Sequence, residues 1–460
     1  MYRTIVVSLL LALGIANLAH AADAKRPNII LIMADDLGYE TLGCNGGTSY
    51  KTPNLDELAA TGVRFERCYV QPVCTPTRIG LMTGMSNARN YIEFGKLDPK
   101  AVTFGHLFKN AGYATGIAGK WQLGREKDSA QKFGFDESCL WQQTRRPPRY
   151  ANPGLEYNGE ERDFTNGEYG PDLVSDFALE FIDKHKSKPF FLYYPMMLTH
   201  APYQPTPDSK DWDPKAMGEE VNKGVKRFAD NVAYMDKLVG KLVKKVDELG
   251  LRDNTLILFL GDNGTGPGVV SQFKGAAYPG GKGQTTARGM NVPLIANWPG
   301  HTPAGTVNED LIDSTDFLPT ICAAADIKVP ESIKQDGRSF LPQIEGKKGD
   351  PREWIYTWYA PDGMPPIREF VATKEYKLYR NGRFFDLTKD PYEEKPPKQI
   401  DDLTGNDAAA AKKLKAILAK FDDARPAKFA KMSAEAAPRV AKQKAARQKN
   451  RKQSKADGDE

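Results

Sequence analysis

The stretch Pro72-Val73-Cys74-Thr75-Pro76-Thr77-Arg78-Ile79-Gly80-Leu81-Met82-Thr83-Gly84 places a cysteine at the start of a predicted helix. Pro76 suits the first turn of a helix, where its missing N–H leaves no hydrogen bond unmade. Cys74 would then lie beside unpaired backbone N–H groups at the positive end of the helix dipole, and Arg78 would add a positive charge one turn further on. The stretch therefore predicts a binding site for a tetrahedral anion.

The same stretch resembles the signature of the type I sulfatases, the formylglycine-dependent branch of the alkaline phosphatase superfamily. Their core motif is C-x-P-x-R followed by an apolar pair and T-G, and this chain matches it with Cys74, Pro76, Arg78 and residues 81–84. In that family a maturation enzyme oxidises the cysteine to formylglycine, whose hydrated aldehyde is the nucleophile. The resemblance implies this role for Cys74 and a catalytic role for Arg78.

Pairs of oxygen-bearing side chains follow two apolar runs of the chain. The runs, residues 28–33 and 255–260, are typical of strands buried on both faces of a parallel sheet. Ligands of such sheets bind at the carboxyl ends of strands, and adjacent carboxylates repel each other unless a cation or strong donors hold them. The resemblance implies that these side chains, together with residue 74, bind a divalent metal, Ca²⁺ in preference to Mg²⁺. The four side chains are Asp35, Asp36, Asp262 and Asn263.

Four residues in three further motifs are implied by the resemblance to hold the sulfate group. Residues 119–124 read G-K-W-Q-L-G and are similar to the second family signature, G-K-W-H-L-G, so that Lys120 would bind sulfate and assist the leaving oxygen. Within H-A-P, His200 would contact sulfate and could move a proton. Within G-G-K-G-Q-T, Lys282 would be the second sulfate-binding lysine. Gln122 completes the predicted substrate-binding set.

The chain departs from the family pattern at two places. Gln122 stands where the family has a histidine, and a glutamine amide cannot accept a proton near neutral pH. The family continues the Lys282 motif with E-G-G-x-R-V-P, whereas this chain has Ala287 in place of the glutamate and Asn291 in place of the arginine. Another base, from the irregular 125–175 segment or from water, would have to replace the histidine. That segment shows little periodicity and predicts a long loop near the site.

Fold class and domain organisation follow from the strand and helix patterns together with the resemblance. We expect an alkaline-phosphatase-like α/β/α sandwich with a mixed central sheet, plus a small C-terminal α+β subdomain. A four-three spacing of apolar residues predicts one long amphipathic helix over 221–249, or two helices in line. The predicted parts are a signal peptide (1–21), a catalytic domain (22–345), an antiparallel-sheet subdomain (346–405) and a helical, then basic and disordered tail (406–460).

The two ends of the chain differ in composition from its body. Residues 5–16 form an apolar run after Arg3, and Ala19-His20-Ala21 fits a signal-peptidase site, so we expect an exported protein, periplasmic or secreted, without a membrane span. The net charge of +5 belongs to the tail, because residues 424–460 hold 11 Lys and Arg but only 4 Asp and Glu. That stretch has almost no large apolar residues, which predicts disorder.

These observations predict an enzyme that hydrolyses sulfate esters, with a sulfated carbohydrate as the expected substrate, a maturation enzyme as a partner and no nucleic acid. The covalently bound sulfate would leave as the second hydroxyl of the formylglycine hydrate is deprotonated. Two alternatives stay open. One is a phosphoesterase or phosphonate hydrolase on the same fold, although Cys74 within C-x-P-x-R favours a sulfatase. The other is a catalytically impaired protein that binds sulfated glycans, which the departures at Gln122 and Ala287 would favour.

Overall fold

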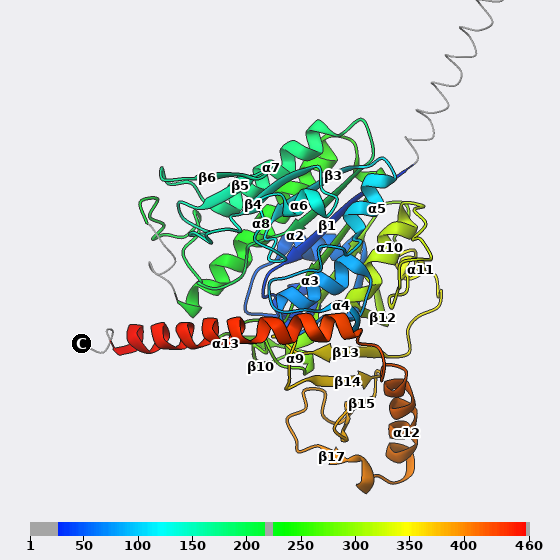
Figure 1. The fold of residues 1–460 in the computed structure, drawn as a ribbon. Helices are drawn as coiled ribbons and strands as arrows, with labels where there is room; N and C mark the ends of the chain where they lie inside the picture. The colour runs from blue at the N-terminus through cyan, green and yellow to red at the C-terminus, as the bar shows by residue number, and fades with distance from the viewer. Residues whose placement is uncertain (1–25, 217–223, 457–460) are drawn as a thin grey trace, which may run out of the picture.

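A ten-stranded mixed sheet forms the centre of the molecule (Figure 1). The computed structural model describes residues 26–216 and 224–456. Strand order across the sheet is β12 (Thr306–Asp313), β2 (Val63–Tyr69), β11 (Asn291–Asn297), β8 (Thr255–Gly261), β1 (Asn28–Ala34), β7 (Phe190–Pro195), β3 (Ala114–Gly119), β4 (Glu137–Trp141), β5 (Gly154–Tyr157) and β6 (Glu160–Asp163).

Strand β1 shows why the sheet is covered on both faces. Its residues alternate between two apolar clusters: Ile29 and Leu31 join one, and Ile30 and Ile32 join the other. Such a strand is stable only when helices cover each face. The first cluster includes α3 (Cys74–Thr83), α5 (Phe104–Asn110) and α10 (Phe317–Ala324), and the second includes α2 (Pro53–Ala60), α7 (Gly170–Lys184) and α8 (Phe228–Glu248). The expected α/β/α sandwich is confirmed.

Five neighbouring strands at the middle of the sheet run in the same direction. β8 pairs with β1, β1 with β7, β7 with β3, and β3 with β4, all in parallel register. Antiparallel pairs occur on either side of this block, at β11 with β8 and at β4 with β5, which makes the sheet mixed as expected. Because the five strands are parallel, their carboxyl ends lie at one edge of the sheet. The loops that leave this edge can therefore meet.

A second, five-stranded antiparallel sheet follows the main one in the chain, which agrees with the expected α+β addition. Its hairpin turn at Asn381-Gly382 joins the third and fourth strands, and Gly382 has a φ of +86° as such a turn requires. The strands are β13 (Ile355–Tyr359), β14 (Arg368–Ala372), β15 (Tyr376–Tyr379), β16 (Arg383–Asp386) and β17 (Lys398–Gln399), and helix α12 (Gly405–Ala419) contacts β14 and β15.

The C-terminal segment differs from its prediction. The structure has a helix, α13 (Ala427–Ala456), where the composition predicted disorder. Phe429, Ser433 and Ala436 are buried, at spacings of four and three that place them on one helix face. The small side chains of Ser433 and Ala436 allow this face to pack closely on the body. A prediction based on the content of large apolar residues does not detect this kind of packing. Figure 1 shows the far end of α13 extending beyond the rest of the described chain.

The segment predicted as a long loop is also partly regular. Residues 125–175 contain β4, β5, β6 and the short helix α6 (Ser129–Lys132), and the three strands extend the main sheet. The pairs β4–β5 and β5–β6 are antiparallel strands of four or five residues, too short to show periodicity in the sequence.

Two predicted segments involve residues outside the described part of the chain. The predicted signal peptide (1–21) lies wholly outside it, as does Val221 at the start of the predicted helix, of which α8 is the described portion. No helix within the described residues has the length and apolar character needed to cross a membrane.

Short elements complete the described structure. They are the hairpin β9 (Val270–Phe273) and β10 (Ala276–Pro279), the helices α4 (Asn87–Asn90), α9 (Ala287–Met290) and α11 (Leu341–Ile344), and the single 3-10 turns η1 (Tyr39–Thr41), η2 (Gly43–Asn45), η3 (Val225–Arg227), η4 (Arg252–Asn254), η5 (Ser314–Asp316) and η6 (Ile400–Asp402).

Candidate active site

Four of the five parallel strands deliver most of the predicted site residues to one edge of the main sheet. Asp35 and Asp36 follow β1, Lys120 follows β3, His200 follows β7 and Asp262 follows β8. Backbone hydrogen bonds tie these strand ends together, including those from the amide of Lys120 to Pro195 (2.7 Å) and from the amide of Asp262 to Ala34 (2.9 Å). The meeting of motifs that are far apart in sequence is therefore a consequence of sheet topology.

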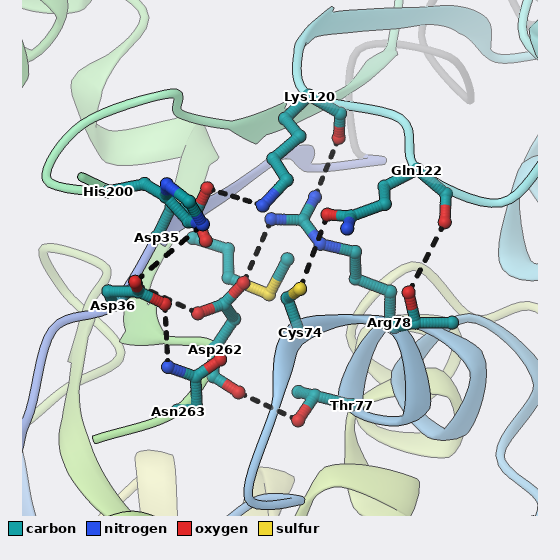
Figure 2. Close-up of polar contacts among 12 residues, drawn as sticks. Asp35, Asp36, Cys74, Thr77, Arg78, Lys120, Gln122, His200, Asp262 and Asn263 are labelled. Carbon is teal, nitrogen blue, oxygen red and sulfur yellow. Dashed lines mark hydrogen bonds and ion pairs between the residues drawn. The ribbon is translucent and has the colours of Figure 1, made fainter. Parts of the chain in front are cut away.

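Cys74 is the first residue of helix α3 and is buried beside Gln122, as Figure 2 shows. Its thiol Sγ donates to Gln122 Oε1 at 3.2 Å. Burial, the largest influence, raises the pKa of the Cys74 thiol, so the unmodified thiol is a poor nucleophile at neutral pH. Gln122 has a φ of +56°, a left-handed conformation that is uncommon outside glycine and that points its amide at the cysteine.

Arg78 lies one turn along α3 and is almost wholly buried. Its Nη2 donates to Asp262 Oδ2 (3.0 Å) and its Nη1 to the carbonyl oxygen of Lys120 (2.6 Å). These two contacts join the end of β8 to the end of β3. The structure therefore gives the Arg78 guanidinium a positioning role behind the pocket (Figure 2).

Each of the three carboxylates at the site is paired with one cation. Lys120 Nζ lies 2.6 Å from Asp35 Oδ2, Lys282 Nζ lies 2.6 Å from Asp36 Oδ2, and Arg78 pairs with Asp262. The carboxylates are 3% exposed or less, so each depends on its partner. With the charges balanced in this way, an added divalent cation would leave a positive surplus, which suits an anionic ester.

The donor atoms at this edge fit a hard divalent cation. Ligand atoms of Asp35, Asp36 and His200 lie within 4.8 Å of one another, and so do those of Asp35, Cys74 and Asp262. Asp35 Oδ1 and Asn263 Oδ1 are buried and have no hydrogen-bond partner among the described residues. Buried oxygen atoms rarely go unpaired, and a cation would satisfy both.

The charge environment acts differently on the three carboxylates. Burial alone would raise the pKa of Asp35, but the charges of Lys120 and Arg78, and that of His200 when it is protonated, outweigh this effect and hold the pKa of Asp35 well below its usual range. The pKa of Asp36 is also lowered: burial raises it, and the charge of Lys282 overcomes that effect. In contrast, burial and the negative charge of Asp35 raise the pKa of Asp262 to about 7.

His200 faces the same pocket with one of its two ring nitrogens. Nε2 lies 3.8 Å from Asp36 Oδ2, whereas Nδ1 lies against the carbonyl oxygen of Ala201 and 3.2 Å from Arg149 Nη1. Burial lowers the pKa of His200 to about 4, so the imidazole is neutral at neutral pH. Arg149 was missed by the sequence reasoning because it lies in the segment interpreted as a loop, and no motif marks it.

Lys282 is carried by a loop that depends on Thr265 and Glu40. The amide of Lys282 donates to the carbonyl oxygen of Thr265 (3.0 Å), and Thr265 Oγ1 donates to Glu40 Oε1 (2.6 Å). Thr265 Oγ1 also accepts from the amide of Gly38 (3.0 Å). Glu40 thus supports a loop for which the sequence lacked the usual glutamate, since Ala287 stands at that position. A lone glutamate after the Asp-Asp pair gave no signal of this role.

Comparison with known proteins places these features in a family. The sulfatase family model matches residues 27–327, and the model described as N-sulphoglucosamine sulphohydrolase, C-terminal, matches residues 284–421. Human arylsulfatase A is 32% identical over 432 residues, which cover 84% of this chain and 80% of that protein. The pig N-acetylgalactosamine-6-sulfatase is 34% identical over 374 residues, which cover 73% of this chain and 69% of that protein.

A solved structure agrees with the sequence comparison. The crystal structure of Ps i-CgsB in complex with k-i-k-neocarrahexaose superimposes with a TM-score of 0.73 at 28% identity, covering 87% of this chain and 94% of that one. The chain thus resembles these proteins in sequence and in fold, and it belongs to the sulfatase family, whose members hydrolyse sulfate esters.

Proposed function

We propose that this enzyme removes sulfate from a sulfated carbohydrate, using formylglycine formed from Cys74 and one divalent cation, Ca²⁺ in preference to Mg²⁺. The observation that carries the proposal is the placement of Cys74 at the start of α3, within 4.8 Å of ligand atoms of Asp35 and Asp262. The carbohydrate substrate is supported by the relatives, which include an N-acetylgalactosamine-6-sulfatase and a protein solved with neocarrahexaose.

Asp35, Asp36, Asp262 and Asn263 would hold the cation, because they supply only oxygen donors and two of those oxygens are unpaired among the described residues. When bound, the cation supplies charge that polarises sulfate oxygens. The formylglycine hydrate supplies the attacking hydroxyl.

The side chains of the pocket bind and orient the sulfate group. Lys120 Nζ contacts Asp35 and Lys282 Nζ contacts Asp36, and both ammonium groups would neutralise sulfate oxygens. His200 Nε2 lies near Asp36 and would contact the sulfate and move a proton at that atom. Gln122 Oε1 would hold a hydroxyl on residue 74 in place of the thiol that it now accepts from.

The test combines the chemistry of residue 74 with turnover of a small substrate. Mass spectrometry of the peptide containing Cys74, from active enzyme, should show loss of the thiol sulfur. Replacing Cys74 by alanine should lower the turnover of 4-nitrophenyl sulfate by about 10⁴-fold or more, because the nucleophile is removed.

Cys44→Ala, at a half-buried cysteine outside the pocket, is the matched control and should retain activity. An unmodified cysteine in fully active enzyme would end the formylglycine proposal. Faster turnover of 4-nitrophenyl phosphate than of the sulfate ester would instead favour a phosphoesterase.

A further inference from the structure

A cavity of about 390 Å³ lies between helix α13 and the catalytic body. Five segments of the chain line it, and two of its lining residues, Arg439 and Val440, come from α13. The remaining lining residues come from segments 93–96, 124–126 and 361–362 and from Arg146. The C-terminal helix is thus one wall of a half-open cavity on the body.

Helix α13 and the residues just before it are fastened to one short strap of the body, Tyr91–Glu93. Arg425 Nη1 donates to the carbonyl oxygen of Tyr91 (3.1 Å), and the fully buried Ser433 donates to that of Ile92 (2.6 Å). Arg439 Nη2 reaches both carboxylate oxygens of Glu93, at 2.5 and 2.6 Å, and the Glu93 side chain is only 3% exposed. A buried carboxylate bound in this way requires its cation, so the position of α13 at the cavity is fixed.

Two hydrogen bonds connect the cavity to the catalytic centre. The amide of Gly95, a lining residue, donates to Thr75 Oγ1 (3.1 Å), and Thr75 follows Cys74 directly. The amide of Leu97 donates to the carbonyl oxygen of Leu123 (3.0 Å), which lies between Gln122 and the lining residue Gly124. The segments that line the cavity are therefore bonded to the neighbours in sequence of Cys74 and Gln122.

The lining combines an aromatic face with charged side chains of both signs: the cationic ones are Lys96, Arg125, Arg146 and Arg439, and the acidic ones are Glu93, Glu126 and Asp362. Phe94 is 37% exposed, among the most exposed of the large apolar side chains in the described chain. Arg125 is exposed and makes no ion pair with any described residue, and Lys96 and Arg146 also line the space. An aromatic face suits the C–H surface of a sugar ring, and a free guanidinium forms paired hydrogen bonds with a carboxylate or sulfate.

We propose that this cavity binds an anionic saccharide residue adjacent to the one whose sulfate is removed, with Arg125 pairing with its acidic group and α13 as the outer wall. This inference rests on the proposed function, in which the sulfate is removed at the pocket that contains residue 74. A small aryl sulfate reaches only the catalytic pocket and does not use the cavity.

Binding to an inactive variant separates this inference from the catalytic proposal. Cys74→Ala protein loaded with Ca²⁺ is titrated with tetrasaccharides from chondroitin 6-sulfate, heparan sulfate and carrageenan, and the tightest binder is carried forward. Adding Arg125→Ala or Phe94→Ala should raise its Kd at least fivefold. Arg338→Ala, an exposed arginine that does not line the cavity, should leave Kd unchanged. Equal Kd values for the Arg125 and Arg338 variants, or no binding by any tetrasaccharide, would overturn the proposal.

Two further experiments identify the acidic group that Arg125 binds and test whether α13 contributes to the site. With carboxyl-reduced tetrasaccharide, Arg125→Ala should no longer raise Kd if Arg125 binds a carboxylate. It should still raise Kd if Arg125 binds a sulfate. A chain ending at Lys442 keeps Arg439 and Val440 and should bind like the full chain, whereas a chain ending at Ala437 should lose at least fivefold in Kd. Equal loss in both would show that the tail acts by charge alone and would overturn the role of α13. In otherwise wild-type protein, 4-nitrophenyl sulfate turnover reports on the catalytic proposal independently.

Discussion

Asp35 and Glu40 lie five residues apart in the loop that leaves β1, and both are buried, yet their surroundings are opposite. Lys120 contacts Asp35 at 2.6 Å, and the surrounding cations hold the pKa of Asp35 well below its usual range. Glu40 makes no ion pair with any described residue, and burial raises its pKa to about 7. Burial penalises both carboxylates, so the difference comes from whether a cation is present to compensate it.

The two carboxyl groups therefore suit different roles, metal binding at Asp35 and structural hydrogen bonding at Glu40. The Asp35 side of the loop keeps carboxylates ionised at neutral pH, as metal binding requires. The Glu40 side tolerates a carboxyl group that is protonated over part of the neutral range and serves as a hydrogen-bonding partner of Thr265. Experiments that break the ion pair at Asp35, or that remove the titratable carboxyl group of Glu40, test this difference directly.

The largest expected effect comes from removing Asp35. Asp35→Ala takes away one proposed metal ligand and leaves Lys120 without its carboxylate. We expect loss of bound Ca²⁺ and a decrease in kcat/KM of about 10³-fold or more, since a metal ion contributes several kcal/mol to charge stabilisation. Leaving a buried ion unpaired should also cost about 3–5 kcal/mol of stability. Elemental analysis and turnover of 4-nitrophenyl sulfate measure the first two effects, and thermal unfolding measures the third.

Asp208→Ala is the matched control for this variant, because Asp208 is exposed and forms a surface ion pair with Lys237. It should keep both metal and activity. Unchanged metal content and activity in Asp35→Ala would refute the proposed site and, with it, the contrast between the two carboxylates.

The sequence predicted the site around Asp35, whose burial is offset by cations, and missed the role of Glu40. Asp35, Lys120 and Asp262 stand in ordered motifs next to apolar runs, and the pairing of parallel strands then brings them together. Glu40 acts through a side-chain contact with Thr265, 225 residues away in the chain, and no local pattern encodes such a contact.

The same limit explains the error at helix α13. Ser433 bonds to Ile92, 341 residues away, and composition cannot report that contact. Regular structure in 125–175 escaped prediction for a different reason, because the strands there are too short to show an alternation.

An intermediate effect is expected at Gln122, which touches Cys74 but cannot accept a proton near neutral pH. If no other base replaces the missing histidine, release of sulfate limits turnover, and wild-type enzyme should show a burst of about one nitrophenol per site. Gln122→His should then abolish the burst and raise kcat about 10²-fold, at the lower end of the 10²–10⁴-fold range that positioned bases contribute. Stopped-flow absorbance measures both quantities.

Gln131→His, which adds a histidine away from the pocket, should keep the burst and the wild-type kcat. Linear product release with rapid turnover in the wild-type enzyme would contradict this prediction. It would show that another group, for example one contributed by the 125–175 segment, already serves as the base.

The smallest expected effect concerns the stability of the fold. It tests Glu40, the buried carboxyl group that has no ion pair with any described residue. Glu40 has an ordinary pKa of 4.5, raised by burial to about 7 in the folded chain. Between these values the folded state binds more protons than the unfolded state, so stability should fall as pH rises through this window and stay level above it. A difference of this size corresponds to about 3 kcal/mol.

Glu40→Gln keeps an oxygen that can accept from Thr265 but removes the titrating group. We therefore expect the variant to match the wild-type protein near pH 4.5 and to be more stable at pH 8 by up to about 3 kcal/mol. Thermal unfolding of both proteins at several pH values measures the difference, in which the shared titration of other groups cancels. Glu57→Gln, at an exposed glutamate of α2, should show no such divergence. Parallel pH profiles for Glu40→Gln and wild-type protein would mean that Glu40 is compensated after all, and Arg288, the cation whose charge already lowers its pKa slightly, would be the first candidate for its partner.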